Sequence, residues 1–359
     1  TFYRLLILLF IFFSFRFTQR DWITLICMAY FPISSATRAL FTDVSFMQSF
    51  TYGLKWMLPV IYILLFIRLK ETDGFNLPLK VLDIWKYMIP GLLIAEYIAD
   101  IGNSTYYDAG FRGYFYCTND IGFSLTMMII YSLYKFLLVK MEVKTLIPVV
   151  LNLVAIIILS TKSCLLFSGI TVGYFMLKNF KKEPKKNFLI VTVTFGLVLL
   201  ILYRMQNSLM QIVGRYMNFY LQVTSEEVSL TNIMGFLTSA RTYRISGVIS
   251  DLAMDFTAGK VVFGWKLPVF TEAIEMDWLD VFFQHGVIGV SILFLFYVRI
   301  VFTRQYKKPF GYMLIIAMIC ACFSGHVVNG ALPSTVFSII VGAAIYSKGS
   351  NGQFFGSDE

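Results

Sequence analysis

The stretch GWKLPVFTEAIEMDWLDVFFQHGVIGV, residues 264–290, joins the longest polar interval of the chain to an apolar segment. Its polar half holds four acids, Glu272, Glu275, Asp277 and Asp280. Its apolar half begins at a Gly-Val-Ile-Gly step, residues 286–289. Acids are favoured at a helix N-terminus, but four of them exceed what one helix end requires. We therefore expect some of these carboxylates to have a chemical role.

The composition places this stretch in a membrane protein. Hydrophobic residues make up 58% of the 359 residues and charged residues only 14%, whereas soluble domains carry about 25% charged residues. Because a spanning helix needs about 20 apolar residues, we predict an all-α polytopic membrane protein with about eleven transmembrane helices in a single domain, residues 1–359. The predicted spans are 3–15, 22–39, 50–67, 87–101, 120–139, 145–160, 163–177, 187–204, 284–303, 310–328 and 332–347.

Basic residues set the predicted orientation. Most of the 30 Lys and Arg residues fall in alternate loops, and cytoplasmic loops carry such an excess. The external side then receives the 100–120 loop, a short turn at 160–163 and one large loop, 205–283. Within the large loop we expect helices at 207–222 and 236–256. The net charge of +9 reflects this topological bias and gives no argument for nucleic acid.

Basic residues on the predicted external side form the first candidate site. Arg112 lies between two glycines and precedes Asn119, and Lys162 lies in a Ser-Thr-Lys-Ser turn. Arg241 and Arg244 are about one helical turn apart and share a face. Guanidinium groups bind phosphate through two parallel hydrogen bonds, so a convergence of these residues would bind an anion. The alternative is that each pairs with a nearby acid or extends to lipid headgroups.

The acids form the second candidate site. Asp277 and Asp280 share one face of a helix, and Glu275 lies on a neighbouring face. A carboxylate here can accept the proton of a sugar hydroxyl, bind a cation or cap the helix, and Asp280 is the simplest capping residue. The two histidines and five cysteines form no metal-binding pattern, and we expect no metal or other cofactor.

These features, in this order, resemble the O-antigen polymerase and ligase superfamily over about residues 105–300. GFRGYFYCTNDIG at 110–122 looks like its Arg-x-x-Gly…Asn segment, and LSTKSCLLFSG at 159–169 looks like its Ser-Arg/Lys-Ser turn, with Lys162 as the basic member. TSARTYRI at 238–245 looks like the Gly-Arg that opens a helix in the large loop. EMDWLD at 275–280 is similar to the acidic patch of the polymerase branch, because the ligase branch has a His where this chain has Glu275.

The resemblance implies a GT-C-like, O-antigen ligase-like architecture in the bacterial inner (cytoplasmic) membrane, with the active site on the periplasmic side. It implies a glycosyltransferase that polymerises undecaprenyl-diphosphate-linked oligosaccharide repeat units by inverting transfer without a metal. Capsule and O-antigen polysaccharides are both possible products. Implied partners are this lipid-linked oligosaccharide, membrane lipids, a chain-length regulator and a flippase.

The resemblance also assigns roles to the candidate residues. Glu275, Asp277 and Arg241 would be catalytic, and the diphosphate and glycan would contact Arg112, Asn119, Lys162, Arg244 and Asp280. Two alternatives remain open. A ligase would move the finished glycan to another acceptor with the same fold and arginines, whereas a lipid-linked oligosaccharide flippase or other transporter would perform no chemistry.

Overall fold

The computed structural model describes residues 16–71, 76–105, 110–115, 117–135, 143–180, 241–266, 273–303 and 329–344, with isolated positions between 192 and 327. The chain forms two compact units, one of residues Thr1–Lys80 with Tyr243–Glu359 and one of residues Val81–Thr242. Helices α5 (Asn76–Ile98) and α12 (Arg241–Met254) each pass from one unit to the other. The prediction of a single domain stays a prediction.

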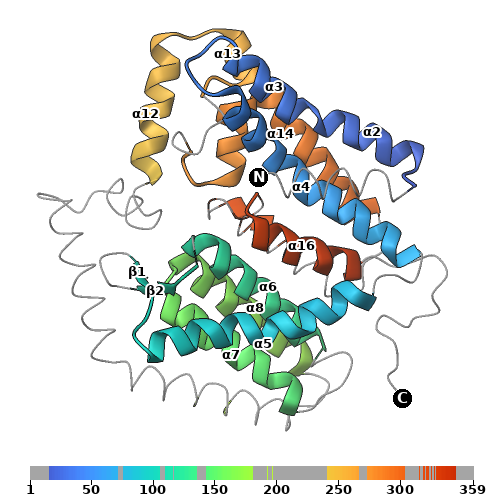
Figure 1. Cartoon of the computed structure of the whole chain (residues 1–359), viewed down its shortest axis with the longest axis vertical. Coiled ribbons are helices and arrows are strands. Elements are labelled where there is room, and N and C mark those ends of the chain that lie inside the picture. The colour runs from blue at the N-terminus through green and yellow to red at the C-terminus, as the bar shows by residue number, and fades with distance from the viewer. Residues whose placement is uncertain are drawn as a thin grey trace, which may run out of the picture. The chain divides into compact units, whose positions relative to one another are not determined.

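The first unit is built from helices (Figure 1). They are α2 (Gln19–Met28), α3 (Tyr30–Ala39), α4 (Phe46–Glu71), α13 (Ala258–Phe263), α14 (Asp277–Thr303) and α16 (Ala331–Ala344). Helix α4 packs against both α3 and α16, and α13 packs against α14. Gly53 allows the close approach of α4 to α3, because a Cβ there would lie 2.6 Å from the carbonyl oxygen of Phe31.

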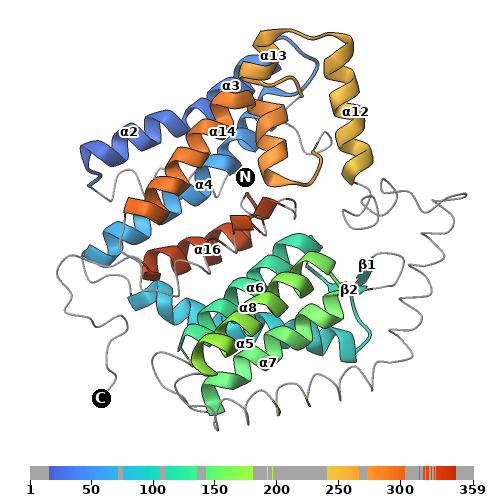
Figure 2. The same ribbon diagram turned by 180° about the vertical axis from the view of Figure 1, so that it is seen from behind.

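The second unit contains helices α6 (Thr118–Tyr134), α7 (Val143–Leu159) and α8 (Lys162–Phe180), which lie side by side in both views (Figures 1 and 2). Buried hydroxyl groups lie between α6 and α8, where the Thr126 and Ser168 oxygens are 3.1 Å apart. Small and hydroxyl-bearing residues between apolar helices are the packing residues that membrane helices use.

The predicted spans within the described residues overlap helices, although the span 22–39 is divided between α2 and α3, and Gly325 and Val327 of the span 310–328 lie in turns. Two helices, Phe46–Leu69 within α4 and Asp277–Ile300 within α14, are long and apolar enough to cross a membrane. The apolar helices Leu146–Leu159, Ser163–Tyr174 and Ala331–Gly342 are shorter. The predicted spans 3–15, 187–204 and 310–328 lie wholly or mostly outside the described residues. The largely helical fold is therefore confirmed, and the count of about eleven spans stays a prediction.

A short hairpin corrects the all-α prediction. Strands β1 (Asn103–Thr105) and β2 (Gly110–Gly113) pair antiparallel in the predicted external loop that contains Arg112. Glycines make this pairing possible, because Gly102 and Gly113 have positive φ angles of 121° and 60° and touch each other. The Glu96 carboxylate of α5 accepts the backbone N–H of Tyr114 at 3.2 Å. This contact holds the hairpin to the end of α5.

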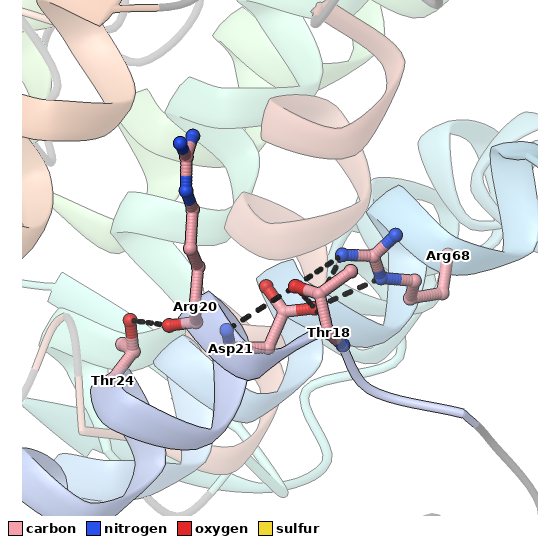
Figure 3. Close-up of polar contacts among 5 residues, drawn as sticks. All are labelled: Thr18, Arg20, Asp21, Thr24 and Arg68. Carbon is pink, nitrogen blue, oxygen red and sulfur yellow. Dashed lines mark hydrogen bonds and ion pairs between the residues drawn. The ribbon is translucent and has the colours of Figure 1, made fainter.

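A polar cluster links the start of α2 to the last turns of α4 (Figure 3). Thr18 and Asp21 form a capping box, and the Arg68 guanidinium donates to the Asp21 carboxylate. Burial alone would raise the pKa of Asp21, but the hydrogen bonds from Thr18 and Arg68 outweigh it, so the pKa lies below its usual value. The Arg20 side chain points away from this cluster in Figure 3.

Candidate functional site

The acidic stretch leads directly into α14, which bends at Gly286. This residue has φ 66° and ψ −166° inside the helix. A Cβ at Gly286 would lie 2.2 Å from the carbonyl oxygen of Val262, and one at Gly264 would lie 2.5 Å from that of Gln284. The turn after α13 therefore packs backbone to backbone against the bend. Only glycine fits both positions, as a positive φ and backbone neighbours together require.

Asp280 organises the segment before α14. Its carboxylate accepts three backbone hydrogen bonds, from Ile274 at 2.6 Å, Glu275 at 3.1 Å and Met276 at 3.2 Å. Asp280 is buried. The structure thus gives it the capping role that the sequence offered as one alternative, and its predicted contact with substrate stays a prediction.

Glu275 has a strained backbone and an accessible side chain. Its φ is 69°, a left-handed conformation that is uncommon for residues other than glycine and that recurs at functional sites. Its carboxylate lies 3.4 Å from the Arg244 guanidinium, and the Glu275 side chain is 37% exposed. The backbone of Glu275 also fits against Gly325, where a Cβ would lie 2.1 Å from the Glu275 carbonyl oxygen. Two contacts within the chain therefore fix this conformation. Asp280 accepts the Glu275 N–H, and Gly325 packs against the Glu275 carbonyl.

Asp277 is buried, in contrast to Glu275. One of its carboxylate oxygens accepts the backbone N–H of Val327 at 2.9 Å, and the residue is 2% exposed. The Tyr52 and Tyr297 hydroxyls lie within electrostatic reach of the Asp277 carboxylate. Of the two acids predicted to be catalytic, Glu275 is the one whose carboxylate a substrate can reach.

His285 has a packing role. It is fully buried, and its ring lies 4.9 Å from the ring of Phe31. Its Nδ1 atom is 3.0 Å from the Ser34 hydroxyl, and its carbonyl oxygen accepts the Tyr30 hydroxyl at 3.0 Å. His285 therefore joins α14 to α3.

The remaining candidate residues belong to the second unit, where the segments that carry them meet. Gly110 of β2 packs against Ser160, since a Cβ there would lie 3.1 Å from the Ser160 Cβ. Gly122 of α6 packs on the Cys164 sulfur and on the Thr161 hydroxyl, since a Cβ there would lie 2.6 Å and 3.1 Å from them. Arg241 acts electrostatically on the Cys164 thiol. The turn at 159–164 therefore packs against β2 and α6, and Arg241 lies within electrostatic reach of it.

This arrangement brings together the parts of the chain that hold Arg112, Asn119, Lys162 and Arg241. Arg112 lies on β2, Asn119 in the first turn of α6, and Lys162 at the first position of α8. Asn119 and Arg241 are largely buried, and Arg112 is partly exposed. Cys117, beside them, is not an activated nucleophile, because burial and then the Asp120 carboxylate raise its pKa to about 11. The predicted convergence of the side chains themselves stays a prediction.

Several features of the site have no counterpart in the sequence interpretation. Gly325 packs against Glu275, and Val327 donates to Asp277, from about fifty positions away in the chain. Local sequence patterns cannot predict such contacts. Within the described part of the chain, no group of three or more His, Cys, Asp or Glu side chains is arranged to hold a metal ion. The helix expected at 207–222 and the first five residues of the one expected at 236–256 lie outside the described residues.

Comparison of the chain with protein-family models, with curated proteins and with solved structures found no match.

Proposed function

We propose that the protein is a polytopic membrane glycosyltransferase that polymerises undecaprenyl-diphosphate-linked oligosaccharide repeat units. In this proposal about eleven helices form a GT-C-like, O-antigen ligase-like fold in the bacterial inner membrane, and the reaction takes place on the external side. The observation that carries the proposal is the meeting of the segments of Arg112, Asn119, Lys162 and Arg241 around the 159–164 turn. A diphosphate is the anion that such a concentration of cationic and amide groups suits.

The proposed reaction joins a growing glycan to one new repeat unit. A hydroxyl oxygen of the acceptor sugar attacks the anomeric carbon of the donor from the side opposite the diphosphate. The bond between that carbon and the diphosphate oxygen breaks, and undecaprenyl diphosphate leaves with the electron pair. Arg241, Arg112 and Lys162 would stabilise the negative charge that develops on this leaving group. The configuration at the anomeric carbon inverts.

Glu275 is the proposed general base. It would accept the proton of the attacking hydroxyl, for which a carboxylate must come within hydrogen-bond reach of the substrate. Its partly exposed side chain meets this requirement, whereas Asp277 is buried and bonded to Val327. Arg244, 3.4 Å from Glu275, would orient the carboxylate. Asp277 and Asp280 would then support the segment that holds the base.

A reconstituted assay tests this proposal. Purified protein is mixed with undecaprenyl-diphosphate repeat units, without nucleotide sugar or metal, and wild type is compared with Arg241→Ala and Glu275→Gln. We expect a ladder of longer lipid-linked glycans from wild type and none from either variant. If donor is consumed only when another acceptor is added, the protein is a ligase and not a polymerase. Activity retained by both variants would remove the assigned roles.

The alternative from a different class is a flippase or transporter of lipid-linked oligosaccharide. The observation that favours it is the burial of polar side chains on the two helices long enough to span, among them Tyr52 of α4 and Gln284 of α14. Ionisable and polar groups inside membrane helices often line a transport path. Movement of a labelled lipid-linked glycan across vesicles, with no longer product formed, would establish this alternative.

A further inference from the structure

The segment from Met254 to Phe263, which contains α13, exposes an unusual number of large apolar side chains. Met254 is 80% exposed, Phe256 65% and Phe263 54%, and Val262 is also exposed. Single exposed apolar residues are ordinary on protein surfaces, but four within ten positions are not. The same segment carries charge, because Lys260 forms an ion pair with Asp255. Large apolar side chains beside charged ones characterise segments that lie in the membrane interface.

The packing of this segment on α14 fixes its position along that helix. The backbone N–H groups of Trp265 and Lys266 both donate to the carbonyl oxygen of Phe283, at 2.8 and 2.9 Å. Val262 and Gly264 lie against the bend at Gly286. Beyond this bend α14 is continuously apolar from 286 to 298 except for one serine. Residues 254–266 are therefore held at the point where the helix becomes fully apolar.

Helix α3 extends the exposed apolar surface. Arg38 of α3 donates to the carbonyl oxygens of Phe263 and of Lys266, which ties the end of α13 to this helix. Close to Arg38 in the chain, Leu40 is 69% exposed and Phe41 83% exposed. Figures 1 and 2 both show α13 beside α3 and α14. The exposed apolar side chains of residues 254–263 thus have exposed apolar neighbours at the end of α3, which Arg38 holds against the end of α13.

We infer that residues 254–263 form a membrane-surface anchor whose partner is the lipid bilayer. Met254, Phe256, Val262 and Phe263 lie at the boundary between headgroups and acyl chains, and the charged residues of the segment face the headgroups and water. This inference concerns a part of the chain without a role in the proposed reaction, and it holds for an enzyme or a transporter alike.

Nitroxide labels in proteoliposomes test the anchor. Phe256→Cys and Phe263→Cys are made in the full chain with its native cysteines replaced, provided that this background melts at the wild-type temperature. Collision of the label with oxygen, which concentrates in lipid, is compared with collision with a water-soluble nickel chelate. Ser246→Cys, at an exposed polar position of α12, is the aqueous control, and Leu295→Cys, 64% exposed on α14, is the lipid control.

We expect the labels at 256 and 263 to favour oxygen over nickel at least severalfold relative to the label at 246. Equal nickel accessibility at 246, 256 and 263 would overturn the anchor and place the segment in water. Protection of 256 and 263 from both reagents would also overturn it, since the surface would then be covered by protein. Neither result depends on whether the protein forms glycan.

Discussion

Asp280 accepts the backbone N–H of Glu275 at 3.1 Å, and Glu275 is held in a left-handed conformation with φ 69°. Such a conformation costs about 1–2 kcal/mol for a residue with a side chain. It persists only where the surroundings determine it, and here Asp280 on one side and Gly325 on the other do so. The strain directs the Glu275 carboxylate toward Arg244. A glutamate in this position therefore costs stability that a glycine would not.

The first prediction separates these two properties at Glu275. Glu275→Gly removes the conformational strain and should raise the melting temperature of the purified protein, reflecting about 1 kcal/mol of added stability. The same variant should form no glycan ladder. Glu275→Gln, which keeps the side-chain shape, should melt as wild type does, because an exposed ion pair contributes roughly 0–1 kcal/mol. A fully active Glu275→Gln variant would show that Glu275 is not the base.

The second prediction concerns Asp280. Asp280→Ala leaves the amides of residues 274–276 without their acceptor, and each buried unpaired amide costs about 1–3 kcal/mol. Asp280→Asn keeps one acceptor oxygen and should lose less stability. Thermal unfolding in detergent should therefore rank wild type above Asn, and Asn above Ala. An Ala variant that melts with wild type would contradict the capping role.

Part of this site could be predicted from the sequence because the signals are local. The Gly-Val-Ile-Gly step marks the bend of α14 at Gly286, and the acids cluster just before it. Apolar runs of 15 to 20 residues locate the helices, although α5 begins eleven positions earlier than the predicted span 87–101, at Asn76, and α14 begins seven positions earlier than expected, at Asp277. This extension follows from the carboxylates at its first turn, which favour a helix N-terminus.

The rest depends on contacts between distant residues. Gly325 against Glu275, Val327 on Asp277 and Arg38 on Lys266 each join segments separated by many residues, and periodicity carries no information about them. The left-handed φ of Glu275 is equally invisible, because glutamate has no preference for it. The hairpin of β1 and β2 was missed since its strands are three and four residues long.

The third prediction uses two glycines. Gly286→Ala adds a Cβ at 2.2 Å from a backbone oxygen and at a positive φ, so it should lower the melting temperature by several degrees or prevent folding. Gly247→Ala is the matched control. Its Cβ meets nothing within 4 Å in the middle of α12, and alanine there should stabilise the helix by about 0.5–1 kcal/mol. Equal effects of the two substitutions would refute the backbone packing at the bend.

The last prediction concerns the link between α2 and α4. The Arg68 guanidinium and Thr18 lower the pKa of Asp21 in the folded protein, despite its burial. A carboxylate with a lowered folded-state pKa stabilises the fold above its unfolded-state pKa, near 3.8, and loses this contribution as the pH falls through the folded-state value. Asp21→Asn should therefore melt below wild type at pH 7.

The same reasoning fixes how this difference changes with pH. As the pH falls below about 3.8 and through the lower folded-state pKa, wild type should lose stability that the Asn variant never had, so the two melting temperatures should approach each other. Asp43→Asn, at an exposed acid, is the control for the substitution itself. A melting-temperature gap between wild type and Asp21→Asn that stays constant from pH 7 until the carboxylate is protonated in the folded protein would mean that the charge of Asp21 does not stabilise the link. The hydrogen-bonding shape of the side chain would then be sufficient.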